Sequence, residues 1–350
     1  MWKTIDSLLQ HSIDTNLFPG CAIATGQGSR VLYSNVFGNL SYQSSIPTTS
    51  STLYDVGDLT RVLSTMPLVL IALERGMLSL DDTIDLYLDF VPSDKQNITI
   101  LSLLTHTSGI SSHFYLQQES ENFKQACNTI LKHELQSGIN QKVIDSDMGY
   151  ILLGFILEKI FSLPLDEAFK KYIARPLHFA RTGFLPTSTN VAPTVSDMDT
   201  GELIKGRPQD MNARYLYGVA GNAGLFTDLE DLCQFATLLA GNGTNKHGIL
   251  FSERAIHLAV TERTRGMNAA RGYGFKIMKR SDPFLGHLWP SDGYGLQDNS
   301  SGSFIAVSPE EGFFVTFLTN ADNSPQKRRE LLRFHKLLLN VAFATFQHKV

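Results

Sequence analysis

The chain has 350 residues, of which 43% are hydrophobic and 18% are charged, and its formal net charge at pH 7 is −4. This composition is typical of a globular protein with a full core, formed by one large domain or two closely packed ones. The mildly acidic charge gives no electrostatic reason to expect nucleic acid or an anionic membrane as a partner, and no basic run contradicts this. No apolar run approaches the roughly 20 residues of a membrane-spanning helix, so we expect no membrane span.

The start of the chain carries apolar residues at helical spacing. It lacks the continuous apolar core and the small-residue cleavage site of a signal peptide. We therefore expect a cytoplasmic protein from the chain as it stands, or an exported one if a leader precedes it.

The three cysteines, Cys21, Cys127 and Cys233, are far apart and odd in number. Their spacing is not that of paired metal ligands. Because each lies in an apolar or amphipathic context, we expect buried free thiols.

Strand and helix patterns alternate along the chain in three stretches. Short β-like runs come first, at residues 21–25 and 30–36. Apolar residues at helical spacing then predict helices at 59–75, 147–161, 165–174, 228–240 and 252–262, and a last one at 327–346. Gly76 is expected to stop the first of these helices. Further strand-like runs lie at 274–278, 303–307 and 313–318.

Strands at both chain ends around a helical middle predict an α/β fold. The expected architecture is an antiparallel sheet built from both chain ends, with flanking helices and a mainly helical inserted region. In residue numbers, we expect the sheet domain at 1–57 and 216–350 and the helical region at 58–215. The cleft should lie between them.

Four ordered segments carry a family pattern. They read Leu-Leu-Thr-His-Thr-Ser-Gly-Ile at 103–110, Gly-Tyr-Ile-Leu-Leu-Gly at 149–154, Arg-Pro-Leu-His at 175–178 and Gly-Val-Ala-Gly-Asn-Ala-Gly-Leu-Phe at 218–226. Together they resemble the serine β-lactamase, penicillin-binding-protein and DD-peptidase superfamily, which includes related esterases. The resemblance covers nearly the whole chain and implies that superfamily's fold. It also suggests cell-wall peptides, D-amino-acid amides or small esters as substrates.

The superfamily's mechanism requires three motifs to converge on one acyl centre. A serine at a helix start attacks the acyl carbon, a lysine one turn later helps remove its proton, and a Tyr-x-Asn or Ser-x-Asn group relays protons. A third motif, Lys/His-Thr/Ser-Gly on a strand, binds the substrate carboxylate and lines the oxyanion site.

The first motif reads Asp58-Leu59-Thr60-Arg61 in this chain, in place of Ser-x-x-Lys. Arg61 stays protonated at any relevant pH, so it cannot act as the general base. The carboxylate of Asp58 would repel the oxyanion that develops in acyl transfer. The simpler interpretation is structural, with Asp58 capping a helix and pairing with Arg61 at i,i+3.

The second motif aligns on residues 145–147, so that Asp145 stands where the usual tyrosine would be and Asp147 replaces the asparagine. Ser146 keeps a hydroxyl, but a serine without a neighbouring base is an ordinary polar residue.

The third motif has two placements. Counting back from the strand-like residues 303–309 gives Gln297-Asp298-Asn299, and an alternative at 291–293 requires an insertion. Neither offers a cation or an imidazole, and a substrate carboxylate would meet Asp298 or Asp292 instead.

Three further side chains have simpler structural interpretations. His106 lies in a segment that is structural in relatives, and His287 has no identifiable partner. Ser64 begins no Ser-x-x-Lys motif, because Pro67 stands at the lysine position.

Two function classes follow. The leading prediction is a pseudoenzyme or ligand-binding protein that keeps the β-lactamase-like fold and has lost acyl-serine chemistry; the alternative is an active esterase, peptidase or β-lactamase-like hydrolase with a rearranged site. We expect no cofactor and no metal, because the spacing of Asp58, Asp145 and Asp147 is not that of a metal loop. A small-molecule or cell-wall-peptide-like ligand with cationic or neutral polar groups would fit an acidic pocket.

Overall fold

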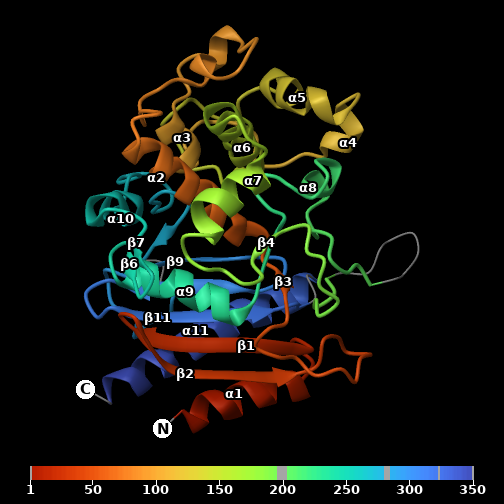
Figure 1. Ribbon diagram of the computed structural model, residues 1–350, viewed down its shortest axis with the longest axis vertical. Helices are drawn as coiled ribbons and strands as arrows, with labels where there is room; N and C mark the ends of the chain where they lie inside the picture. Colours follow the sequence, from red (N-terminus) through yellow and green to blue (C-terminus); the bar gives the residue numbers. More distant parts are fainter. Residues whose placement is uncertain (1, 195–202, 280–283, 322–323, 349–350) are drawn as a thin grey trace.

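A six-stranded antiparallel sheet forms the lower part of the computed structural model in Figure 1, with the strand order β2-β1-β11-β10-β9-β8. The structure describes residues 2–194, 203–279, 284–321 and 324–348. The strands are β1 (Gly20–Gln27), β2 (Arg30–Gly38), β8 (Lys276–Ile277), β9 (Tyr294–Gln297), β10 (Phe304–Ser308) and β11 (Phe313–Thr319). Strand β1 lies between β2 and β11, with Cys21 opposite Thr319, so both chain ends build one sheet.

Helices cover both faces of the sheet. The terminal helices α1 (Lys3–Asp14) and α11 (Pro325–Gln347) contact each other, while α9 (Leu229–Ala240) packs on β1, β10 and β11. Successive side chains of β1 point to opposite faces of the sheet, as in any β-strand. Cys21 and Ile23 belong to the core under the terminal helices, whereas Ala22 and Ala24 belong to the core that includes α9.

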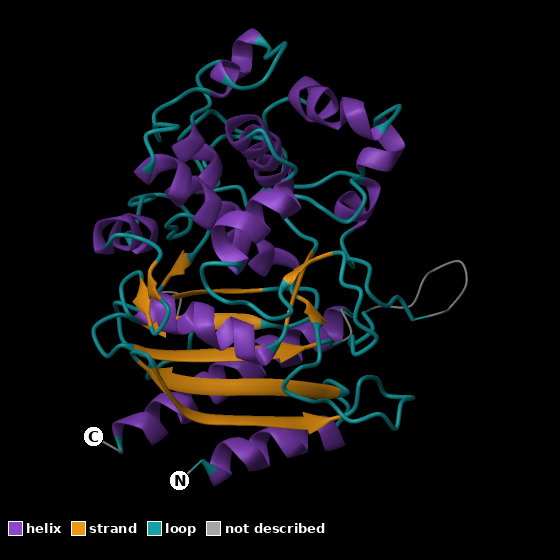
Figure 2. Cartoon of the chain, in the orientation of Figure 1, coloured by secondary structure: helices purple, strands orange, loops and turns teal. Residues whose placement is uncertain are grey.

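The middle of the chain forms a mainly helical region above the sheet (Figure 2). Its helices are α2 (Met66–Glu74), α3 (Ile100–Leu104), α4 (Leu116–Glu119), α5 (Ala126–Lys132), α6 (Asp147–Phe161), α7 (Leu165–Phe169) and α8 (Met211–Tyr215), and α10 (Glu253–Val260) follows later in the chain. Short strands complete the fold, namely β3 (Tyr54–Asp55), β4 (Gly183–Phe184) and β5 (Leu225–Thr227), and the pair β6 (Thr244–Asn245) and β7 (Gly248–Ile249).

The predicted sheet of two chain ends with flanking helices is confirmed. The domain boundaries at 57/58 and 215/216 stay a prediction. Gly76 has a φ of +66° and its N–H bonds to the carbonyl of Leu73, so the expected helix stop is also present. The strand expected at 274–278 is shorter, because Gly274 has a φ of +78°, and β9 was not predicted.

The helix predicted at 59–75 is present, but its first turns are not regular α-helix. The chain makes a 3₁₀ turn, η1 (Gly57–Leu59), and a π-helical turn, η2 (Arg61–Thr65), before α2 begins. Pro67 accounts for the π-helical turn, because it has no N–H to donate and its ring would clash with the carbonyl of Leu63 in a regular α-helix.

All three cysteines are free thiols, as expected. Cys21 and Cys233 are buried, but Cys127 is only partly buried, which corrects the expectation of full burial. Among the described residues, no single helix is long and apolar enough to cross a membrane; α6 and the segment Leu165–Ala174 reach that length only as a pair bent by 70°.

Glycines in the segment 218–224 allow two backbones to approach closely. A Cβ on Gly221 would lie 2.0 Å from the carbonyl oxygen of Tyr150 in α6, and Gly154 in the same helix faces Gly221 across the contact. The hydroxyl of Thr65 donates to the carbonyl of Gly221 over 2.6 Å. The family-like glycine segment therefore contacts both η2 and α6. This contact fixes the first residues of η2 and of α6 relative to each other.

We expect Gly221→Ala to lower the free energy of unfolding by at least about 2 kcal/mol, because the added methyl overlaps the backbone of α6. Urea denaturation measures the effect. The matched control is Gly183→Ala, where an added Cβ meets no heavy atom within 4 Å and the change should stay within about 0.5 kcal/mol. Equal stability of the two variants would contradict the packing role of Gly221.

Candidate functional site

A polar cavity of about 580 Å³ lies beside η1 and the start of α6. Its lining is rich in carboxyl groups and includes Asp55, Asp58, Asp145, Asp147, Asp210 and Asp298, together with Arg61, His113 and Arg328. The motif-equivalent positions Asp58, Arg61, Asp145, Asp147, Asp298 and Asn299 thus meet in one place, while Gln297 ends β9 just beside it.

Local backbone geometry presents the two acidic segments to the cavity. Gly57 has a φ of +45°, and a Cβ at this position would lie 2.3 Å from a carboxyl oxygen of Asp298. Ser146 is the N-cap of α6, and its hydroxyl accepts the N–H of Gly149 over 2.9 Å. Asp145 and Asp147 flank this cap, which accounts for Ser146 as a structural residue.

The buried guanidinium of Arg61 links three carboxylates. Its Nη1 donates to Asp145 over 2.5 Å, and its Nη2 donates to Asp58 over 2.6 Å and also to Asp147. The expected pair of Asp58 and Arg61 is present, but the expected cap is wrong, since the N-cap of this turn is Val56 and no side chain caps it. A second arginine, Arg271, donates to the other oxygen of Asp145 over 2.6 Å.

The carboxyl groups of this cluster differ in their pKa values. Burial alone would raise the pKa of Asp145, but the permanent charges of Arg61 and Arg271, which both donate to its carboxylate, outweigh it and hold that pKa well below its ordinary value. Burial raises the pKa of Asp58 well above its ordinary value, and although Arg61 lowers it, neighbouring carboxylates raise it further. Asp58 is therefore the member of the cluster that is hardest to keep ionised.

Asp298 folds back onto the turn that carries residue 58. Its carboxylate accepts backbone N–H groups from Asp58 over 3.1 Å, from Ser300 over 3.2 Å and from Ser301 over 2.5 Å. Burial raises the pKa of Asp298. Asp292, at the alternative placement of the third motif, instead accepts the N–H of Glu310 over 2.7 Å.

Three residues that received structural interpretations lie away from the cavity lining. The Nδ1 of His106 accepts the N–H of Ser146 over 3.0 Å, and burial lowers the pKa of His106 to about 3, so the ring is neutral. Ser64 is fully buried in η2, and His287 is exposed on the surface.

The sequence reasoning missed His113 and Asp210. The Nδ1 of His113 lies 2.8 Å from Asp147, and this hydrogen bond raises the pKa of His113. Ligand atoms of His113, Asp147 and Asp210 lie within 4.8 Å of one another, close enough to hold one cation. The sole signal in the sequence was the position of His113 just after the family-like segment 103–110.

Asp55 was also missed. It accepts the N–H groups of Gly57 and Gln209, over 3.1 Å and 2.6 Å. Burial raises the pKa of Asp55 to about 7, and Asp298 and Asp210 add to the effect. The cavity therefore holds one carboxyl group, that of Asp55, whose pKa lies near neutral pH.

Known proteins resemble this chain over nearly its whole length. The family described as Beta-lactamase matches residues 5–340. The N-acetylmuramyl-L-alanine amidase of Bacillus subtilis (strain 168) is 22% identical over 92% of this chain and 81% of its own length. A structure of a β-lactamase/D-alanine carboxypeptidase from Pseudomonas syringae covers 95% of this chain and 98% of its own, with 18% identity and a TM-score of 0.75. EstCE1, a hydrolase with promiscuous acyltransferase activity, covers 97% and 98%, with 21% identity and a TM-score of 0.77.

Removal of Arg61 should be strongly destabilising. We expect Arg61→Met to cost about 3–5 kcal/mol of unfolding free energy, because three carboxylates lose a shared counter-charge. Thermal and urea unfolding measure this. The control is Lys170→Met, which breaks an exposed pair with Glu167 at 3.6 Å and should cost no more than about 1 kcal/mol. Similar losses in both variants would contradict the central role of Arg61.

Neutralising Asp58 should stabilise the protein in a pH-dependent way. Below about pH 4 residue 58 is protonated in both states, so Asp58→Asn has no advantage there. As the pH rises, the unfolded chain ionises first and the raised pKa penalises the folded state. The advantage of Asp58→Asn should therefore grow as the pH rises toward neutral. Urea titrations at several pH values test this, with the exposed Asp81→Asn as the control for loss of one negative charge; a gain that shrinks with rising pH would refute it.

Proposed function

The chain belongs to the Beta-lactamase family, and we propose that this member binds a small ligand in its acidic cavity without forming an acyl-enzyme. The observation that carries the proposal is the state of residue 58. Its side chain is a carboxylate bonded to Arg61, and its backbone N–H is donated to Asp298.

Acyl-serine chemistry needs a nucleophile, a base and an oxyanion site at one point. Residue 58 offers no hydroxyl, and Arg61 stays protonated, since Asp58, Asp145 and Asp147 keep its pKa raised against the effect of burial. The N–H of residue 58 already serves the carboxylate of Asp298. Residue 58 thus has no hydroxyl to accept an acyl group, and its N–H is already bonded and not free for an oxyanion, which supports loss of the reaction.

The charges around the cavity favour a ligand with cationic or neutral polar groups. The lining carries six aspartates and two arginines. A ligand carboxylate entering beside residue 58 would meet Asp298 and Asp58, a like-charge contact in a partly buried site. The amidase among the relatives suggests a cell-wall-peptide-like ligand, and an amine on such a peptide would match the charge of the cavity.

A second candidate function rests on the pair of His113 and Asp147. A carboxylate that holds Nδ1 of a partly exposed histidine orients the ring for general-base attack by water. In this alternative the protein is a hydrolase in which His113, rather than residue 58, activates the nucleophile.

The expected result for a fluorescent penicillin is that it leaves the protein unlabelled, because no acceptor hydroxyl stands at residue 58. Intact-protein mass spectrometry checks for a covalent acyl adduct. An acylating member of the family, run beside it, controls for the activity of the probe. A stoichiometric adduct on this chain would refute the proposal.

Chromogenic esters separate the two candidates in the same assay plate. The binding proposal expects no turnover above that of the Asp58→Ala variant. Turnover that survives Asp58→Ala but disappears in His113→Ala would instead establish the hydrolase, with His113 as its base.

A further inference from the structure

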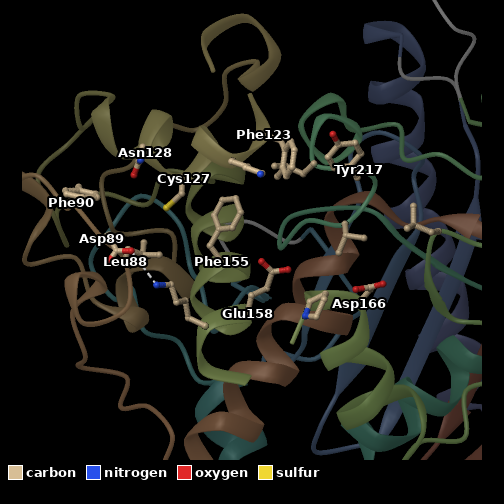
Figure 3. A pocket seen from close by; sticks show the side chains of 16 residues that line it. Leu88, Asp89, Phe90, Phe123, Cys127, Asn128, Phe155, Glu158, Asp166 and Tyr217 are labelled. Carbon is tan, nitrogen blue, oxygen red and sulfur yellow. Dashed lines mark hydrogen bonds and ion pairs between the residues drawn. The ribbon is translucent and has the colours of Figure 1, made fainter. Parts of the chain in front are cut away.

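A second cavity, of about 720 Å³, lies in the helical region and is distinct from the acidic one (Figure 3). Helix α6 connects the two, because its first residue, Asp147, lines the acidic cavity and its later residues Phe155 and Glu158 line the second. Eight residues of helix separate Asp147 from Phe155, which corresponds to roughly 12 Å. The volume lies within the range of about 300–1,000 Å³ that is typical of small-molecule sites.

Aromatic rings form one wall of this second cavity. Phe123 and Tyr217 meet edge to face, with their centroids 4.8 Å apart and an interplanar angle of 80°. The ring of Phe155 projects from α6 toward this pair, and Glu158 lies beside it on the same helix (Figure 3). The ammonium of Lys124 lies 6.0 Å from the centre of the Phe123 ring, so this wall already accepts a cation.

The rim holds bulky apolar residues in an unfavourable backbone conformation. Phe90, Leu185 and Tyr217 have φ values of +58°, +50° and +59°, and their side chains are 89%, 51% and 67% exposed. A left-handed backbone conformation costs free energy for such residues. Because their side chains are exposed, no hydrophobic burial offsets this cost. Three such positions around one cavity indicate that the rim is shaped for contact with a ligand.

Some charged side chains that line the cavity form ion pairs, and others do not. Lys159 pairs with Asp89 over 3.5 Å, and Lys124 is exposed beside Phe123. The partly buried carboxylate of Glu158 accepts the N–H of Leu165 over 3.0 Å, and within the described ranges neither it nor Asp166 has an ion-pair partner. Glu158 and Asp166 thus offer two carboxylates without an ion-pair partner among the described residues, while the exposed Lys124 lies beside Phe123.

We propose that this cavity is a second binding site, for a small organic ammonium ion with an aromatic or branched apolar body. The ammonium lies against Glu158 and Asp166, and the apolar body packs between Phe155 and the pair of Phe123 and Tyr217. This assignment does not depend on the function of the acidic cavity.

Isothermal titration calorimetry with phenethylammonium and 3-phenylpropionate tests the proposal, because the two probes share an apolar body and differ in charge. We expect phenethylammonium to bind at least tenfold more tightly than the carboxylate. Glu158→Gln, which keeps an acceptor for the N–H of Leu165, should weaken phenethylammonium about tenfold. Phe155→Ala should weaken both probes, and Lys124→Met should strengthen phenethylammonium.

Asp58→Asn is the control that separates the two cavities, since residue 58 lines only the acidic one of the two. It should leave the affinity for phenethylammonium unchanged. A large loss of affinity in Asp58→Asn would place the ammonium in the acidic cavity and overturn the proposal. Equal affinity for both probes, or full affinity in Glu158→Gln, would also overturn it. So would concentration-dependent dimerisation in sedimentation velocity that is lost in Phe90→Ser, because the rim would then be an interface between two copies.

Discussion

The buried guanidinium of Arg61 is the interaction on which the site depends. It comes from the π-helical turn η2 and reaches Asp58 on the preceding turn as well as Asp145 and Asp147 around the start of α6. The guanidinium offers five donors in a rigid plane and stays protonated, so it can hold several carboxylates at fixed positions. The charge of Arg61 thus joins three segments of backbone that would otherwise repel one another.

The same arrangement supports the proposal that the cavity does not form an acyl-enzyme. Carboxylates stand at residues 58 and 145, and a further one, Asp298, accepts the N–H of residue 58. Each of these changes makes the site more negative, and each is compensated within the protein by an arginine or by backbone N–H groups. The result is an acidic cavity whose carboxyl groups are bonded within the protein.

The fold has been kept by a separate set of residues. Gly221 allows the backbone of the segment 218–224 to touch α6, and Ser146 caps α6 at its start. His106 is a neutral buried ring that holds the N–H of Ser146. These positions need small size, a capping hydroxyl or a hydrogen-bond acceptor, and none of these requirements involves reaction at residue 58. Packing and catalysis could therefore diverge independently.

The sequence by itself determined the architecture, and it predicted that Asp58 and Arg61 stand at the positions of the family's serine and lysine. Strand patterns at both chain ends, helical spacing between them and four family-like segments were sufficient, because apolar periodicity and glycine positions are local properties of the chain. The pair of Asp58 and Arg61 was also accessible, since its members are three residues apart.

Tertiary structure alone decided which residues surround the pair of Asp58 and Arg61. Asp298 reaches residue 58 from 240 positions away, and His113 meets Asp147 across two different segments. The raised pKa of Asp58 and the second cavity beside α6 likewise follow from packing between distant parts of the chain. Burial and charge proximity are properties of the assembled chain, so no local pattern of residues records them.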